Sequence, residues 1–273
     1  MAAIETIWNP VRGCTPVSPG CERCYAARIG RHFSGVGEPF EGLVEPHGGG
    51  ARFTGVVRVD EQLLEEPLRW GRSPRLVAVG TLGDLFHEQL PDAVIERVLD
   101  VMRQADRHTF RVLTKRARRM QRLVTRVYGG DETKPPPNVW LGVSVEDQRN
   151  ADARVPPLRH TPAAVRYIVC EPLLDRVDLS AHLVRYIVER SSRLVHWVVA
   201  GGETGPRARP LSLSWLRELR LQCELAGVPL YIKQLGSAWA RALPSDWCAG
   251  DDAGRSPRLW PQDLRVRQEA CVS

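Results

Sequence analysis

Three cysteines near the amino terminus, Cys14, Cys21 and Cys24, are the residues whose type and spacing best suit chemistry. They lie in one short segment, with six residues between the first two and two residues between the last two. Three thiolates on one loop are one ligand short of a closed tetrahedral or cubane site, so a metal held there keeps an open coordination position. This arrangement is typical of a catalytic metal centre.

The cysteine usage also indicates a cellular compartment. The chain has seven cysteines in 273 residues, an odd number with three clustered, which suits a reducing compartment better than a disulfide framework. No apolar stretch approaches the roughly 20 residues needed to cross a bilayer, and the first residues lack the pattern of a signal peptide. We therefore expect a cytoplasmic protein that does not engage a membrane.

The positive charge of the chain raises the question of a nucleic-acid partner. The formal net charge is +6 at pH 7, and nearly all basic residues are arginines. A phosphate-binding face and a merely solvated surface are both compatible with the densest group, which comprises Arg103, Arg107, Arg111, Lys115, Arg116, Arg118, Arg119, Arg122 and Arg126.

Strand patterns alternate with helical patterns along the chain. Short β-branched runs predict strands at Ile4–Trp8, Gly55–Val59, Leu76–Val79, Phe110–Leu113, Val139–Val143, Val165–Val169, His196–Ala200 and Leu230–Ile232. Helical spacing predicts helices at Ala93–Ala105, Arg116–Tyr128, Asp147–Leu158, Leu179–Glu189 and Ser212–Ala226. This rhythm predicts an α/β fold, a full or partial TIM-type (β/α) barrel over residues 1–236, with an irregular C-terminal extension, 237–273, packed on it as a cap.

Polar residues follow most of the predicted strands. In such barrels the loops after the strands open on one face, where the chemistry collects. Helix caps and loop charges also follow strands, so a single residue of this kind decides little, but the whole set indicates a polar site. Its members are Asp84, Lys115, Glu146, Glu171, Glu203 and Lys233.

Three motifs carry a resemblance to radical S-adenosylmethionine enzymes, especially the spore-photoproduct-lyase-like branch. The run Asn9–Cys14 followed by Cys21–Arg28 resembles the cluster loop, Val77–Asp84 is similar to the second motif of that branch, and Leu113–Arg116 to its third. Further short sequence motifs across most of the chain resemble those of an uncharacterised phage-associated family, which is placed among radical-SAM-like proteins.

The resemblance implies cofactors and roles for individual residues. Cys14, Cys21 and Cys24 would hold a 4Fe–4S cluster whose fourth iron binds S-adenosylmethionine. The implied cofactor contacts are Tyr25, Thr81, Asp84, Lys115, Ser144 and Glu146, and the substrate-side groups are Glu171, Glu203, Lys233 and Gln234.

The chain departs from the usual pattern of the radical SAM enzymes in three places. The common spacing is Cys-x3-Cys-x2-Cys, whereas six residues separate Cys14 from Cys21, as in the phage-associated family. Arg23 stands where an aromatic residue is common, a role that Tyr25 is expected to take. A Gly-Gly-Glu sequence that resembles the methionine-binding motif, ending at Glu203, comes too late in the chain for that task.

Partners, substrate and reaction outcome are less constrained. The resemblance implies a reductant such as flavodoxin or ferredoxin and a three-Cys-motif partner protein, and the basic cluster favours nucleic acid or a modified nucleotide as substrate. Isomerisation, bond scission and methylation all stay open. Two alternatives are a non-catalytic cluster-binding partner subunit and a zinc-stabilised nucleic-acid-binding module, in which His32 or His47 completes the cysteine site.

Overall fold

The computed structural model describes residues 6–129, 135–183, 195–244 and 250–270. The chain divides into two compact units. The N-terminal unit contains Ala3–Val143 and His160–Val165, and the C-terminal unit contains Ser144–Arg159 and Arg166–Ser273 with the first two residues.

Seven strands form one sheet, and every strand pair whose register is defined is parallel. The order is β1 (Thr6–Trp8), β6 (Leu76–Val79), β7 (Thr109–Thr114), β8 (Val139–Ser144), β9 (Val165–Cys170), β10 (Trp197–Gly201) and β11 (Leu230–Gln234). All residues of β8, β9 and β10 are buried, which explains their nearly continuous apolar sequences. The protein is therefore α/β, and β1 and β11 end the strand order, which fits the partial form of the predicted barrel.

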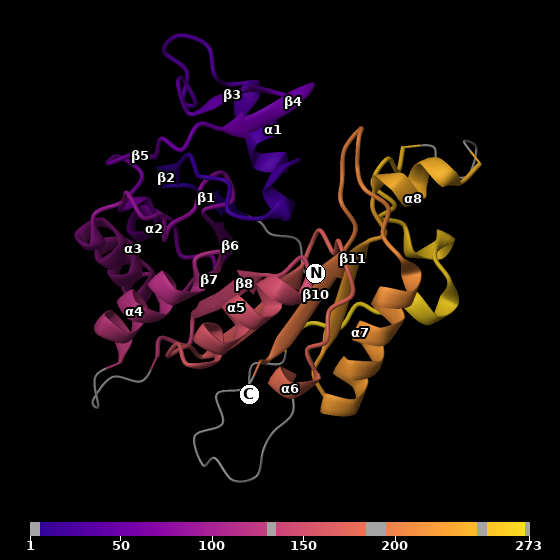
Figure 1. The fold of residues 1–273 in the computed structure, drawn as a ribbon. Coiled ribbons are helices and arrows are strands. Elements are labelled where there is room, and N and C mark those ends of the chain that lie inside the picture. The colour runs from indigo at the N-terminus through magenta and orange to yellow at the C-terminus, as the bar shows by residue number, and fades with distance from the viewer. Residues whose placement is uncertain (1–5, 130–134, 184–194, 245–249, 271–273) are drawn as a thin grey trace. The chain divides into compact units, whose positions relative to one another are not determined.

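The helices of the N-terminal unit are α1 (Tyr25–Arg31), α2 (Glu66–Arg69), α3 (Asp92–Gln104) and α4 (Ala117–Tyr128). In this unit, α3 packs against α2 and α4, whereas the first helix, α1, packs against β3 (Val44–His47) and β4 (Gly50–Phe53) (Figure 1). The apolar face of α3 is buried, as its helical spacing predicts. The Tyr128 hydroxyl at the end of α4 donates to the Leu99 carbonyl of α3 at 2.5 Å, which fixes the two helices together.

Two small antiparallel pairs lie outside the main sheet. β2 (Val11–Arg12) pairs with β5 (Arg58–Val59), and β3 (Val44–His47) pairs with β4 (Gly50–Phe53). The predicted strand Gly55–Val59 is thus shortened to two residues and does not join the parallel sheet. The physical reason is local, because Gly55 has a φ of +96°, which interrupts an extended run.

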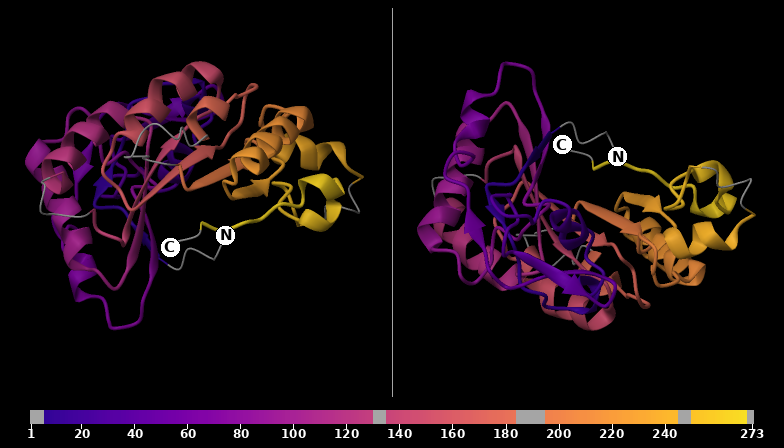
Figure 2. Two further views of the ribbon diagram at one scale, coloured as in Figure 1. Left: turned by 90° about the horizontal axis from the view of Figure 1, so that it is seen from below. Right: turned by 90° about the horizontal axis from the view of Figure 1, so that it is seen from above.

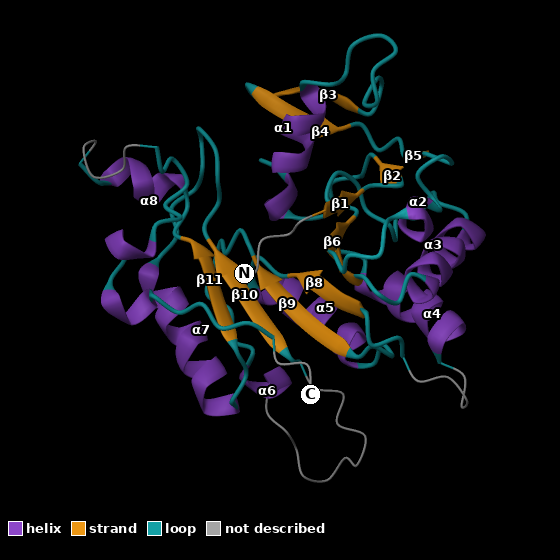
Figure 3. Ribbon diagram, turned by 180° about the vertical axis from the view of Figure 1, so that it is seen from behind, coloured by secondary structure: helices purple, strands orange, loops and turns teal. Residues whose placement is uncertain are grey.

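The C-terminal unit places α7 beside β10 and β11 (Figure 3). Its helical elements are α5 (Gln148–Arg159), α6 (Ser180–Leu183), α7 (Leu213–Ala226), α8 (Ser237–Ala242) and the 3-10 turns η2 (Pro257–Leu259) and η3 (Gln262–Leu264). Of the predicted helix Leu179–Glu189, α6 is the observed part, and residues 184–189 lie outside the described residues.

The C-terminal segment packs along the last strand. Gln268 donates its backbone N–H to the Leu230 carbonyl at 2.9 Å, and Ile232 donates to the Val266 carbonyl at 2.9 Å. Trp260 is buried, and its Nε1 donates to the Gly254 carbonyl at 3.0 Å. Figure 2 shows this yellow segment next to the orange α7, and η3 contacts that helix.

Candidate functional site

The cysteine loop connects β2 to α1. Cys14 lies two residues after β2, Cys21 ends the 3-10 turn η1 (Pro19–Cys21), and Cys24 is the N-cap residue of α1. All three thiols are free and partly buried. Gly13 precedes the loop with a φ of +89°, and a Cβ atom there would lie 2.1 Å from the Val56 carbonyl oxygen. The loop therefore starts at a position that only glycine fits.

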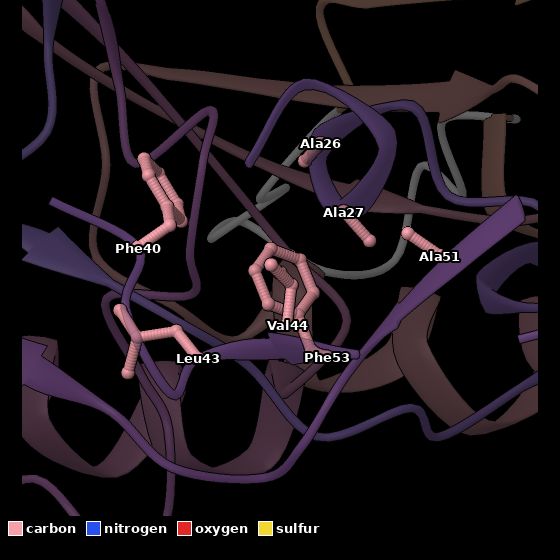
Figure 4. Packing of buried hydrophobic residues seen from close by; sticks show 7 residues of the cluster. All are labelled: Ala26, Ala27, Phe40, Leu43, Val44, Ala51 and Phe53. Carbon is pink, nitrogen blue, oxygen red and sulfur yellow. The ribbon is translucent and has the colours of Figure 1, made fainter. Parts of the chain in front are cut away.

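A cluster of buried hydrophobic residues packs against the cysteine loop, and Figure 4 shows the members of this cluster. Cys14 and Cys24 both pack against it. Small residues let α1 approach closely, and a Cβ at Gly30 would lie 2.8 Å from the Phe40 ring. The cluster therefore fixes two of the three thiols from one side, and its members are Ala26, Ala27, Phe40, Leu43, Val44, Ala51 and Phe53.

Arg116 connects this loop to the ends of β6 and β7. It lies two residues after β7, and its side chain is 3% exposed. Its Nη1 donates to Asp84 Oδ2 at 2.8 Å and contacts Cys14 Sγ at 3.6 Å, and its Nη2 donates to the Thr15 carbonyl at 3.2 Å. The guanidinium group thus binds a strand end and the cysteine loop at the same time.

Asp84 is buried and uses both carboxylate oxygens within the protein. Oδ1 accepts hydrogen bonds from the Phe86 backbone N–H at 2.9 Å and from Thr114 Oγ1 at 2.8 Å, and Oδ2 accepts from Arg116. The Thr114 hydroxyl also accepts from the Arg116 backbone N–H at 2.9 Å, which orients the start of α4. A ligand amino group at Asp84 must share oxygens that already accept these hydrogen bonds.

His87 provides a second connection to the loop. Its Nε2 lies 2.7 Å from Thr15 Oγ1, and its Nδ1 accepts the Gln89 backbone N–H at 3.2 Å. Because Nδ1 is an acceptor, the proton resides on Nε2, which donates to the threonine. Burial, followed by the Arg116 charge, lowers the pKa of His87, so the ring is neutral at pH 7.

Tyr25 and Thr81 meet next to the cysteines. The Tyr25 hydroxyl donates to the Thr81 carbonyl at 3.1 Å, and Thr81 Oγ1 donates to Asn9 Oδ1 at 3.3 Å. The Leu82 backbone N–H donates to the same Asn9 oxygen at 3.2 Å, so the loop after β6 is attached to the end of β1.

The electrostatics of the thiols reflect burial and neighbouring charges. Burial, reinforced by the Asp84 charge and opposed by Arg116, raises the pKa of Cys14 to about 12. Burial also raises the pKa of Cys24, while Lys115 acts in the opposite direction. The Cys21 charge contributes to both shifts. Metal binding here would therefore displace protons from these thiols.

The donor set is suited to iron–sulfur ligation, because it consists of thiols next to two cations, Lys115 and Arg116, which stabilise thiolates. Among the described residues, no three His, Cys, Asp or Glu side chains lie close enough together to hold a metal ion as they stand.

A second polar group lies at the ends of β9 and β11 in the C-terminal unit. Lys233 Nζ donates to both oxygens of Glu171, at 2.9 and 3.0 Å, and Gln234 Nε2 donates to Glu171 Oε1. The Gln234 amide also donates to the Gly202 carbonyl at 3.1 Å. Its Oε1 is buried without a hydrogen-bond partner within the described residues, so it can accept from a bound donor.

Two other predicted carboxylates of this unit are paired with arginines. Glu146 is 1% exposed and accepts from Arg154 Nη1 at 2.8 Å, and the same nitrogen donates to the Ser144 carbonyl at 2.8 Å. Glu203 binds the Arg209 guanidinium group and accepts the Arg209 backbone N–H at 2.8 Å. These acids are fixed in place by their arginines.

The predicted site residues thus fall into one set in each unit. The N-terminal unit brings Tyr25, Thr81, Asp84 and Lys115 to the cysteine loop, and the C-terminal unit contains Ser144, Glu146, Glu171, Glu203, Lys233 and Gln234. The roles of Arg116 and Thr15 were not predicted from the sequence. The available signals were the position of Arg116 two residues after β7 and that of Thr15 directly after Cys14.

Much of the predicted basic cluster is neutralised by carboxylates. Arg103 pairs with Asp100, and three of the four arginines on α4 pair with acids at the start of α3. Arg111 is buried with its guanidinium group 4.9 Å from the Trp140 ring centroid. These contacts engage several arginines of the cluster within the protein, and the α4 pairs are Arg119–Asp92, Arg122–Asp92 and Arg126–Glu96.

In the described part of the chain, no helix combines the length and the apolar character required of a bilayer span.

Comparison with known proteins identifies a family without a described activity. No curated protein and no solved structure matches the sequence. A family model described as "protein of unknown function (DUF5131)" matches residues 2–259. The chain is therefore a member of the DUF5131 family.

Proposed function

We propose that this protein is a radical S-adenosylmethionine enzyme in which Cys14, Cys21 and Cys24 hold a 4Fe–4S cluster. The observation that carries the proposal is the placement of three free thiols on one loop, which Arg116 and His87 bind to the C-terminal ends of neighbouring parallel strands. Ligand sites in parallel α/β sheets lie at these strand ends.

The bound cluster would supply one electron, received from a reductant such as flavodoxin or ferredoxin, to cleave the sulfonium of S-adenosylmethionine into methionine and a 5′-deoxyadenosyl radical. Residues of the chain bind and orient this co-substrate. The Thr81 loop, held by hydrogen bonds to Asn9 and Tyr25, is proposed to position its adenosine. Lys115, whose charge acts on Cys24, is suited to its carboxylate.

Asp84 is proposed to bind the amino group, in competition with its present partners Thr114 and Arg116. We propose Glu171, Lys233, Gln234 and Glu203 as substrate-side groups, because the first three already form a connected polar network that offers an unused acceptor.

The class of substrate stays a prediction. Nucleic acid or a modified nucleotide was favoured by the basic cluster, and the ion pairs on α4 leave fewer arginines to support it. Binding of labelled DNA and RNA at two salt concentrations tests this class, because phosphate contacts weaken steeply with salt. Absence of salt-dependent binding would favour a small molecule or peptide.

The reaction class is tested by reductive cleavage of the co-substrate. Anaerobically reconstituted protein with dithionite and S-adenosylmethionine should release 5′-deoxyadenosine, and the C14A/C21A/C24A variant should release none. C223A is the matched control, because Cys223 is a free buried thiol of the other unit. A cluster without cleavage would indicate the partner-subunit alternative, and stoichiometric zinc without sulfide would indicate the zinc module.

A further inference from the structure

The guanidinium group of Arg116 lies against the first cysteine of the loop. Its Nη1 is 3.6 Å from Cys14 Sγ, and the same nitrogen donates to Asp84 at 2.8 Å. Its Nη2 donates to the carbonyl of Thr15, the residue after Cys14, at 3.2 Å. One planar group therefore contacts both the sulfur and the backbone of this part of the loop.

The position of the guanidinium group is determined from three sides. Its Nη1 donates to Asp84 at 2.8 Å, and its Nε donates to Glu88 at 2.7 Å. The backbone N–H of Arg116 donates to the Thr114 hydroxyl. Only 3% of the side chain is exposed, so water screens its charge weakly. A lysine at this position could not make these contacts together, because its single ammonium group lacks the planar fork.

We infer that Arg116 is a positioning residue that holds the Cys14 thiolate for the cluster and raises the reduction potential of that cluster. The inference rests on the proposed function. When one electron arrives from a reduced flavodoxin or ferredoxin, the added negative charge falls partly on the cysteine sulfurs, and a cationic N–H next to Cys14 stabilises it. Hydrogen bonds to the sulfurs are among the groups that set iron–sulfur potentials.

The test compares Arg116→Lys with Arg119→Lys. Both arginines lie at the start of α4 and both pair with a carboxylate, but Arg119 binds Asp92 and the carbonyls of His87 and Leu90 instead of the cysteine loop. The midpoint potential of the reconstituted cluster is measured by an EPR-monitored redox titration without S-adenosylmethionine, after circular dichroism has shown that each variant is folded.

We expect the Arg119→Lys protein to match the wild type. The Arg116→Lys protein should show a reduction equilibrium constant about tenfold lower, a shift of about 59 mV for one electron, or should be folded but fail to retain iron. Asp84→Asn/Arg116→Gln is the second variant, because it removes the N–H···S contact while it keeps the net charge of the buried pair at zero.

Equal potentials and equal iron content in the wild type and both Arg116 variants would overturn this inference and leave the proposed function standing. A wild-type protein that binds no iron and no sulfide would overturn both.

Discussion

Asp84 and Arg116 form a buried ion pair with an Oδ2–Nη1 distance of 2.8 Å, and the arginine of this pair also contacts Cys14. The two residues come from segments 32 positions apart, one after β6 and one after β7. The pair therefore joins two strand ends to the loop that carries the candidate metal ligands.

Removal of the arginine should destabilise the N-terminal unit strongly. Arg116→Met leaves the Asp84 carboxylate buried without its cation, which costs about 3–5 kcal/mol for such pairs. Urea denaturation at pH 7 measures the loss in the free energy of unfolding. Glu88→Gln is the control, because the Glu88 side chain is 64% exposed and its contact with Arg116 should contribute about 0–1 kcal/mol. Equal losses in the two variants would contradict the central place of the buried pair.

Replacement of Gly13 should destabilise the protein, because the backbone of Val56 lies very close to this residue. A Cβ there would lie 2.1 Å from the Val56 carbonyl oxygen, whereas Gly37 has a similar φ, +79° against +89°, and no atom within 4 Å of the Cβ position. Both alanine variants carry the strain of a positive φ, and Gly13→Ala should cost about 1–3 kcal/mol more from overpacking. Thermal unfolding of the two variants checks this. The account of the loop is wrong if Gly37→Ala proves the more harmful.

Stability should fall as the pH falls below about 6.5. Burial lowers the pKa of His108 in the N-terminal unit and of His196 in the C-terminal unit from the ordinary value of 6.5. Well above pH 6.5 both histidines are neutral in the folded and in the unfolded chain, so they do not change the free energy of unfolding there. Below it the unfolded chain binds protons that the folded chain resists, and stability is lost until the pH reaches the lowered folded values.

Denaturant midpoints at pH 8, 7, 6 and 5.5 measure this loss, and His108→Phe tests the contribution of one ring. His108 packs edge-on against Trp70 and Phe110, and neither ring nitrogen has a hydrogen-bond partner within the described residues, so phenylalanine fits the site chemically. The variant should lose less stability between pH 7 and 5.5 than the wild type. An identical pH dependence in the variant would show that His108 does not contribute.

The main strands and long helices could be predicted because they are long, apolar and periodic. The run Phe110–Leu113 predicted β7, which extends by one residue at each end, and the spacing of Val98, Val101 and Met102 predicted α3. The β3–β4 hairpin was missed, because its strands are short and combine polar with apolar residues.

The acids of the site could be predicted from their positions after strands, but their partners could not. Glu146 pairs with Arg154 within the same strand–helix segment, whereas Asp84 pairs across 32 residues, and only the folded chain shows which arginine reaches it. From the sequence, Lys115 and not Arg116 was chosen as the basic residue of the site. Sequence patterns define the end of a strand only to within one or two positions, so they do not show which of two adjacent residues points into the protein.

The central claim is that three thiols near the amino terminus hold an iron–sulfur cluster. The most direct measurement is the iron and acid-labile sulfide content per chain of anaerobically purified wild type, C14A/C21A/C24A and the control C223A. The account predicts about four of each in the wild type and in C223A, as a 4Fe–4S cluster requires, and almost none in the triple variant. Iron and sulfide that persist without Cys14, Cys21 and Cys24, or a wild type that binds neither, would contradict it.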